Sequence, residues 1–105
     1  MGNLFEPPKE ELMQRLIRSN TKALVMGMTN GRADIIEASL INLHAAVQIA
    51  AILMKEGKIK DDTEMIQIMT DQTDLALQDN YTQEMANEDW TWARTNLDAV
   101  LGQVR

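Results

Sequence analysis

A chain of 105 residues is long enough for one domain but buries only a modest core, so association between copies would add stability. With 45% hydrophobic, 25% charged and 4% aromatic residues, the composition is globular and disfavours a β-sandwich or a disordered chain. The net charge of −6 disfavours nonspecific DNA binding, and the absence of Cys excludes disulfides and thiolate metal sites. We therefore expect one all-α domain over residues 1–105 that is homo-oligomeric and takes no cofactor.

The first thirty residues predict an irregular arm followed by a helix. Residues 1–6 offer only Leu4 and Phe5 as apolar anchors, and we expect a helix from Pro8 to Met28, because proline is favoured at the first helical position. The predicted apolar face consists of Leu12, Met13, Leu16, Ile17, Ala23, Leu24 and Met28. On the other side lies a row of cations that we call the basic stripe: Arg15, Arg18 and Lys22.

The stretch from Ala33 to Met54 is the most apolar part of the chain and is predicted to be the central helix. Thr29-Asn30-Gly31 before it and Gly57 after it are helix-stop signals, which makes residues 8–57 an antiparallel hairpin. At 100° per residue the stretch has two opposed apolar lines. One line is Ile36, Leu40, Leu43, Val47, Ala50 and Met54, and the other is Ala38, Ile41, Ala45, Ile49 and Ile52. We expect core on one side and a subunit interface on the other.

Residues 61–105 form an acidic half with two basic and ten acidic side chains. Asp61 and Glu64 have the spacing of a capping box, which predicts a third helix starting near Asp62. Its predicted inward residues are Met65, Ile66, Ile68, Met69, Leu75, Ala76 and Leu77. Asn87 is the predicted cap of a last helix, whose core side is Trp90, Ala93, Leu97, Val100, Leu101 and Val104, while Trp92 points elsewhere. The predicted architecture is the hairpin plus these two helices, a small four-helix bundle.

No motif in the chain predicts an enzyme or a metal site. His44 is the only histidine and has no carboxylate at ligand spacing. The pairs Asp71 with Asp74 and Glu88 with Asp89 are ordinary for solvated faces and first turns of helices. The sequence shows neither a Gly-rich phosphate loop nor a nucleophile with a recognisable base. We expect a cytoplasmic protein without a membrane segment, because polar residues interrupt the apolar stretch and no basic, apolar leader pattern is visible.

The basic stripe has two interpretations. Charge rows on helices are commonly solvated or paired with an acidic surface, which here would be the acidic half. The other interpretation is an anion site, because two Arg and one Lys at helical spacing suit the oxygens of a phosphodiester.

The first half of the chain resembles a family of phage proteins. The matching features are Phe5 with Pro7-Pro8, the spacing of Arg18, Lys22 and Leu24, the region of Arg32, and the run NLHAAVQIAAI over residues 42–52. Over residues 4–56 these resemble the helical hairpin of the anti-CBASS and anti-Thoeris sponges. The resemblance implies oligomers of small hairpin subunits that hold cyclic di- or trinucleotides between subunits without hydrolysing them. It also implies that Arg18 and Lys22 contact phosphate and that Pro8 borders the pocket.

The leading hypothesis from the sequence is a phage or prophage protein that binds and sequesters cyclic oligonucleotide immune signals in the bacterial host cell. Its predicted ligand-binding residues are Arg15, Arg18, Lys22, Pro8 and Arg32. One alternative is an acidic inhibitor or immunity-type protein that binds a basic protein through Asp71, Asp74 and an exposed tryptophan. The other alternative is a purely structural oligomer.

Overall fold

The computed structural model describes residues 8–101, and of Leu101 only the backbone. This range contains four α-helices and no strand, which confirms the predicted all-α class and helix number. The helices are α1 (Lys9–Thr29), α2 (Ala33–Lys55), α3 (Asp62–Ala76) and α4 (Gln83–Leu101). The expected N-terminal arm with Leu4 and Phe5, Pro7, the side chain of Leu101 and Val104 lie outside the described residues.

The predicted boundaries of the first two helices and the predicted start of the third agree with the structure to within one residue. Gly31 and Gly57 follow α1 and α2 with φ of 65° and 75°, a left-handed conformation that favours glycine. At α3 the Asp61 carboxylate accepts a hydrogen bond of 3.0 Å from the Glu64 N–H, which confirms Asp61 as the cap. The Glu64 carboxylate in turn accepts from the N–H of Lys60, one residue before the cap.

The predicted start of the last helix is wrong, because α4 begins at Gln83 rather than after Asn87. The Thr82 hydroxyl accepts a hydrogen bond from the Met85 N–H and so satisfies a free donor of the first turn. Asn87 instead lies inside the helix, where its side-chain oxygen accepts from Gln83. Thr82 therefore replaces Asn87 as the capping residue, five residues earlier in the chain.

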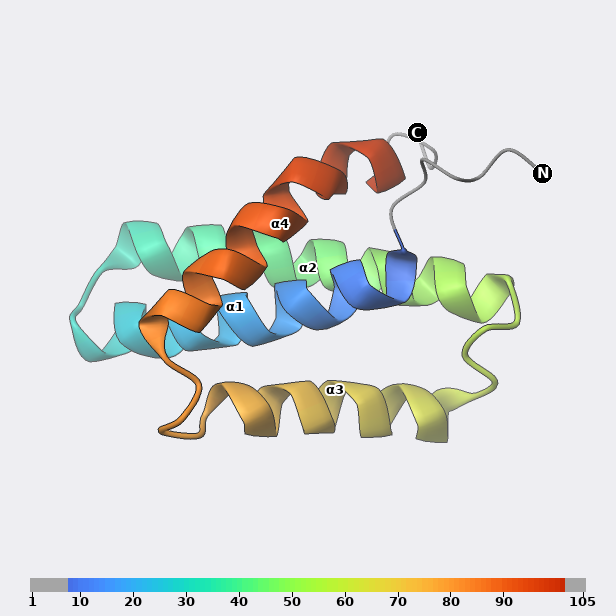
Figure 1. Cartoon of the computed structure of the whole chain (residues 1–105), viewed down its shortest axis with the longest axis horizontal. Helices are drawn as coiled ribbons and strands as arrows, with labels where there is room; N and C mark the ends of the chain where they lie inside the picture. The colour runs from blue at the N-terminus through green and yellow to red at the C-terminus, as the bar shows by residue number, and fades with distance from the viewer. Residues whose placement is uncertain (1–7, 102–105) are drawn as a thin grey trace.

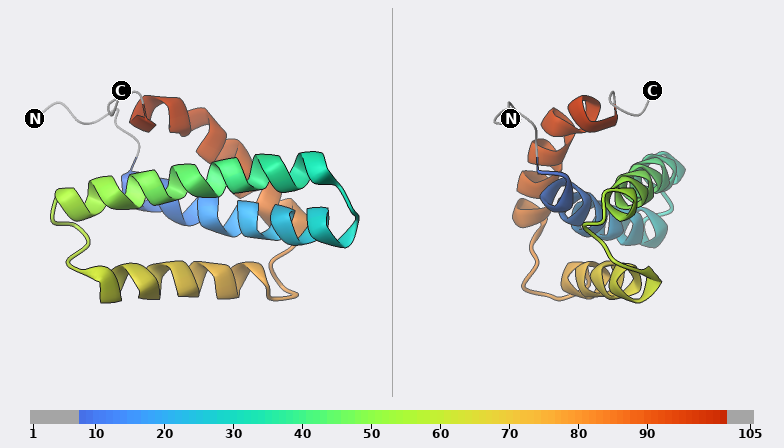
Figure 2. Two further views of the ribbon diagram at one scale, coloured as in Figure 1. Left: turned by 180° about the vertical axis from the view of Figure 1, so that it is seen from behind. Right: turned by 90° about the vertical axis from the view of Figure 1, so that its right-hand side faces the viewer.

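The central helix is α1, not α2 as the hydropathy pattern predicted. α1 packs against all three other helices, whereas α2 and α4 barely touch each other. In the end-on view of Figure 2, α1 lies in the middle, with α2, α3 and α4 on different sides of it. The α1–α2 pair is an antiparallel hairpin as expected, α3 runs along one side of α1, and α4 crosses it obliquely (Figure 1). The main core includes Leu12, Met13, Leu16, Ile17, Ile49, Leu53, Ile59, Ala93 and Val100.

α2 is covered by the chain on one side only, and its other side, where a subunit interface is expected, is exposed in the single chain. The covered side contains Ser39, Ala45, Ala46, Ile49, Ala50 and Leu53, many of them small residues that allow close approach to α1. At Gly27 of α1, an added Cβ would lie 3.0 Å from the side chain of Ile35, so any larger residue would require the isoleucine to shift. Leu40 and Val47, from one predicted seam, are 51% and 50% exposed, and Ile41 from the other is 62% exposed.

α3 and the tryptophans also depart in part from the predicted core. Since α3 packs mainly on α1, Ile66, Leu75 and Leu77 remain exposed, contrary to prediction. Ala76 is buried as predicted. Trp90 and Trp92 both pack, partly buried, against the main core, although their spacing predicted different surroundings. Each tryptophan also lines a cleft with its exposed part, Trp92 the cleft on the outer side of α4 and Trp90 the cleft between α2 and α4.

Candidate functional site

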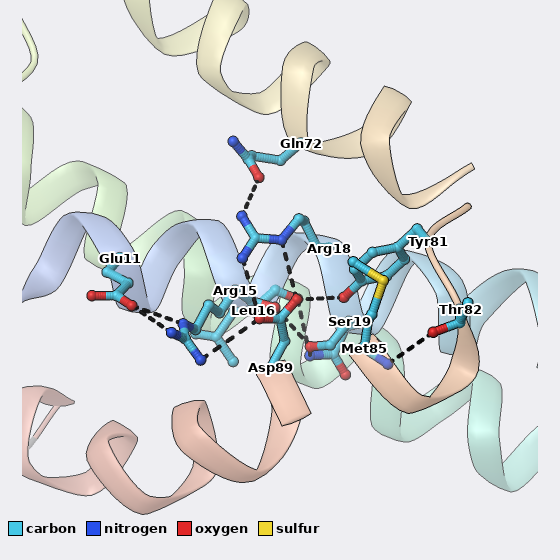
Figure 3. Close-up of polar contacts among 11 residues, drawn as sticks. Glu11, Arg15, Leu16, Arg18, Ser19, Gln72, Tyr81, Thr82, Met85 and Asp89 are labelled. Carbon is cyan, nitrogen blue, oxygen red and sulfur yellow. Dashed lines mark hydrogen bonds and ion pairs between the residues drawn. The ribbon is translucent and has the colours of Figure 1, made fainter. Parts of the chain in front are cut away.

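The basic stripe is paired with the acidic half of the same chain. Arg18 donates from Nε to Asp89 Oδ2 at 3.1 Å and from Nη2 to Asp89 Oδ1 at 3.2 Å, a two-pronged contact between α1 and α4 (Figure 3). Its third nitrogen, Nη1, donates to Gln72 Oε1 of α3 at 2.7 Å. Arg18 thereby connects three helices, and a carboxylate already occupies the position that an anionic ligand would take.

Asp89 is the centre of this cluster and was not singled out as a functional residue by the sequence. It is 8% exposed and accepts a third short hydrogen bond, 2.6 Å long, from the Tyr81 hydroxyl. Burial and the bond to Asp89 raise the pKa of Tyr81 above its ordinary value. Burial lowers the pKa of Arg18, but the hydrogen bond and negative charge of Asp89 raise it by more, so the net shift is upward. Both groups therefore keep their protons firmly in the folded chain.

The other two members of the stripe also have partners within the chain. Arg15 forms a salt bridge of 2.6 Å to Glu11, lies 3.7 Å from Asp89, and places its guanidinium 4.6 Å from the centre of the Trp92 ring. The Lys22 ammonium lies 5.8 Å from the centre of the Tyr81 ring. Lys22 forms no ion pair within residues 8–101, so it is the stripe cation with the least internal neutralisation.

Pro8 and Arg32 are not brought together with the stripe. They precede the first residues of α1 and α2 respectively, at opposite ends of α1, which is about 30 Å long. Arg32 forms a two-pronged pair with Asp34 at 2.8 and 3.1 Å, and that contact raises the pKa of Arg32 and lowers that of Asp34. The five predicted residues therefore do not surround one small ligand within a single chain.

A groove between α2 and α4, with α1 as its floor, is the best-defined polar cleft. We call it the α2–α4 groove; its volume is about 310 Å³, at the lower end of the range of ligand pockets. It is lined by Ser19, Asn20, Ala23, Asp34, Ile35, Ala38, Ser39, Asn42, Gln83, Ala86, Asn87 and Trp90. Small residues widen the groove, while amide and hydroxyl groups from three helices converge on it.

The carboxamides of the α2–α4 groove are held in place by hydrogen bonds. Asn42 Nδ2 donates to Asn20 Oδ1 at 3.0 Å, and Asn20 Nδ2 donates to the Leu16 carbonyl at 3.0 Å. On the opposite wall Gln83 Nε2 donates to Asn87 Oδ1 at 2.9 Å. These bonds leave the Oδ1 of Asn42 and the Nδ2 of Asn87 as one acceptor and one donor for a ligand. The sequence singled out residues of this groove for other reasons, among them Asn87 as a predicted cap and Trp90 as a predicted core residue.

A second cleft lies on the outer side of α4 and is larger but more open. Its volume is about 600 Å³, and its lining combines Trp92 and Arg15 with two carboxylates, Glu84 and Glu88. Asp71 and Asp74, proposed from the sequence to share a protein-binding surface with a tryptophan, lie on the exposed side of α3 instead. α3 and α4 lie on different sides of α1 (Figure 2).

No group of three or more potential metal ligands occurs among residues 8–101, and His44 is exposed on α2. By length and composition α2 could cross a membrane, a property that it shares with core helices of soluble proteins. Comparison with protein-family models, with curated proteins and with solved structures finds no match to this chain. The functional inference therefore depends on the geometry of the chain itself.

Proposed function

We propose that this protein is a non-catalytic binding protein that holds the planar, polar part of a small ligand, such as a nucleobase, in the α2–α4 groove. The observation that carries the proposal is the convergence of fixed carboxamides, Ser39 and Trp90 on one groove of ligand-pocket size. In a phage or prophage setting, binding without turnover would sequester a cyclic oligonucleotide signal and blunt host defence, as the family resemblance implies.

The chemistry of the groove suits a base edge. The Oδ1 of Asn42 and the Nδ2 of Asn87 offer one acceptor and one donor from the two walls, and the polar edge of a purine or pyrimidine carries donors and acceptors that can meet them. Trp90 adds an aromatic surface on which a base can stack, a contact worth about 1 to 3 kcal/mol. A volume of about 310 Å³ accommodates one base or nucleoside, so the remainder of a cyclic di- or trinucleotide would extend outside the groove.

Phosphate recognition is the part of the original hypothesis that needs revision. Arg18 would have to release Asp89 before it could bind a phosphate, and Arg15 would have to release Glu11. Lys22 has no such partner among the described residues, and it directly precedes Ala23, which lines the groove. We therefore assign any phosphate contact of the stripe to Lys22 first.

Titration calorimetry with nucleosides, cyclic di- and trinucleotides and cyclic ADP-ribose isomers tests the proposal. A ligand that binds should lose about tenfold or more in affinity with Asn87→Ala, which removes one groove carboxamide from an exposed helix position. Asn96→Ala is the matched control, because Asn96 lies on the same helix and lines the outer cleft alone, whereas Asn87 lines both clefts. In a Trp92→Phe background, binding should also quench the fluorescence of Trp90. Absence of heat for every ligand would refute the proposal.

The outer cleft of α4 favours a second candidate, the binding of a basic protein segment. Trp92 lies there near Glu84 and Glu88, an arrangement in which a Lys or Arg side chain finds an aromatic surface and carboxylates. A pull-down from bacterial lysate should then recover a basic protein whose binding weakens steeply with salt and is lost in Glu84→Lys with Glu88→Lys. If a nucleotide co-purifies and no such partner appears, the groove hypothesis is favoured.

A further inference from the structure

The side of α2 that faces away from α1 is an exposed surface with an ordered arrangement of charge. We call it the outer face of α2 and define it by Glu37, Leu40, Ile41, His44, Val47, Gln48, Ala51 and Lys55. Leu40, Ile41 and Val47 are each at least half exposed, although they are among the most apolar side chains of the protein. Glu37 lies at one end of this surface and Lys55 at the other, so the face is oppositely charged at its ends and has His44 and Gln48 among the apolar side chains between them.

We propose that the outer face of α2 binds the same face of a second copy, with the two helices antiparallel about a twofold axis level with residue 46. In this register Glu37 of each copy lies opposite Lys55 of the other, so both ends gain an ion pair. The polar side chains of His44 and Gln48 also lie opposite each other. The surface is therefore complementary to itself in this orientation, whereas a parallel pairing would place Glu37 against Glu37.

The apolar part of the face is consistent with the same register. Leu40 of one copy lies opposite Ala51 of the other, a large residue against a small one. Ile41 lies opposite Ile52, so apolar surface meets apolar surface over the middle turns. Burying these side chains removes from water the apolar area that the single chain leaves exposed.

A second copy fits this surface better than a lipid bilayer does. The row of Glu37, His44, Gln48 and Lys55 runs along the middle of the outer face and would have to enter the hydrocarbon. A membrane-crossing α2 would also have to leave α1, where Ile49 and Leu53 are fully buried. Pairing between copies avoids both penalties, because the polar residues of one copy meet polar residues of the other and α2 stays packed on α1.

The expected dimer is weak. α2 is about 35 Å long and about 10 Å wide, so a single-helix contact covers roughly 700 Å² in total, below the size of stable interfaces. We therefore expect association in the micromolar range or weaker, visible as a concentration-dependent mass. The α2–α4 groove is lined by Ile35, Ala38, Ser39 and Asn42 from the opposite side of α2, so dimerisation leaves it open.

Sedimentation equilibrium at low salt, over protein concentrations from about 1 µM to 1 mM, tests the proposal through charge exchange. Glu37→Lys alone places like charges at both ends of the dimer and should weaken association about tenfold or more. Lys55→Glu alone should do the same. The double variant Glu37→Lys with Lys55→Glu exchanges the two charges and should restore association to nearly its original strength.

Ile41→Glu introduces a charge into the apolar middle of the face and should abolish association while leaving the helical circular dichroism unchanged, because Ile41 is 62% exposed. A monomer at all concentrations, or a double variant as weak as either single variant, would overturn the proposed pairing. So would co-sedimentation with vesicles of phosphatidylcholine and phosphatidylglycerol that depends on Ile41, which would assign the surface to a membrane instead.

Discussion

Arg18 and Asp89 are 71 positions apart in the sequence, yet they share two hydrogen bonds of 3.1 and 3.2 Å in a partly buried site. Removing one member of such a pair leaves the other charge without compensation. We expect Asp89→Ala to lower the free energy of unfolding by about 3 kcal/mol, because Tyr81 also loses its acceptor. Urea denaturation followed by circular dichroism measures this change.

The control for this prediction is Asp98→Ala, which removes an exposed carboxylate from the same helix and should change stability by less than about 0.5 kcal/mol. Replacing both partners, as Arg18→Met with Asp89→Leu, should recover much of the loss, because no charge is then left unpaired. Equal losses for Asp89→Ala and Asp98→Ala would mean that the pair contributes little.

The single tyrosine makes the pH dependence directly observable. Burial and the bond to Asp89 raise the pKa of Tyr81 above its ordinary value of about 10, so the folded state favours the neutral phenol. Its contribution to stability is complete below pH ~10 and is lost as the pH rises through the folded-state pKa. Ultraviolet titration of tyrosinate should show a raised midpoint in buffer and the ordinary midpoint in denaturant. A native midpoint at the ordinary value would contradict the buried hydrogen bond.

The start of α3 depends on the Asp61 cap. Since its carboxylate accepts the Glu64 N–H at 3.0 Å, Asp61→Ala should destabilise the helix by about 1 kcal/mol. The neighbouring Asp62 lies in the first turn without a capping bond to its side chain, and Asp62→Ala should cost only ~0.3 kcal/mol through the helix dipole. Hydrogen exchange of the α3 amides compares the two variants, and equal effects would argue against a specific cap.

Ligand binding and self-association should respond independently to mutation. The monomeric variant Ile41→Glu is expected to bind a groove ligand as tightly as the original chain, because the outer face and the α2–α4 groove occupy opposite sides of α2. The sequence had instead led us to expect a pocket at the subunit interface. Calorimetry on Ile41→Glu decides between the two arrangements, since loss of binding would place the ligand between subunits.

Features that depend on a few neighbouring residues were predictable from the sequence. Gly31, Gly57 and the Asp61–Glu64 pair placed the helix ends because each acts within one turn of the backbone. The start of α4 was less determinate, because both Thr82 and Asn87 are good capping residues and local preference does not distinguish them. The structure selects Thr82.

Features that depend on distant contacts were not predictable. The hydropathy pattern identified two apolar sides of α2, but it could not show that α1 packs against only one of them. The choice of Asp89 as the partner of Arg18, among ten carboxylates of the acidic half, follows from the crossing of α4 over α1. The basic stripe was correctly located on one side of its helix, but no pattern in the sequence reveals that this side is an internal contact.

The arrangement of three helices around α1 also determines where the protein should open first. α3 packs mainly on α1, and Ala76 is its only buried residue. We therefore expect α3 to detach before the other helices, an opening that must also release Ile59 and Tyr81, the buried residues of its two connecting loops. Such an opening would free Arg18 from Gln72 and make the connecting loops the preferred sites of proteolysis.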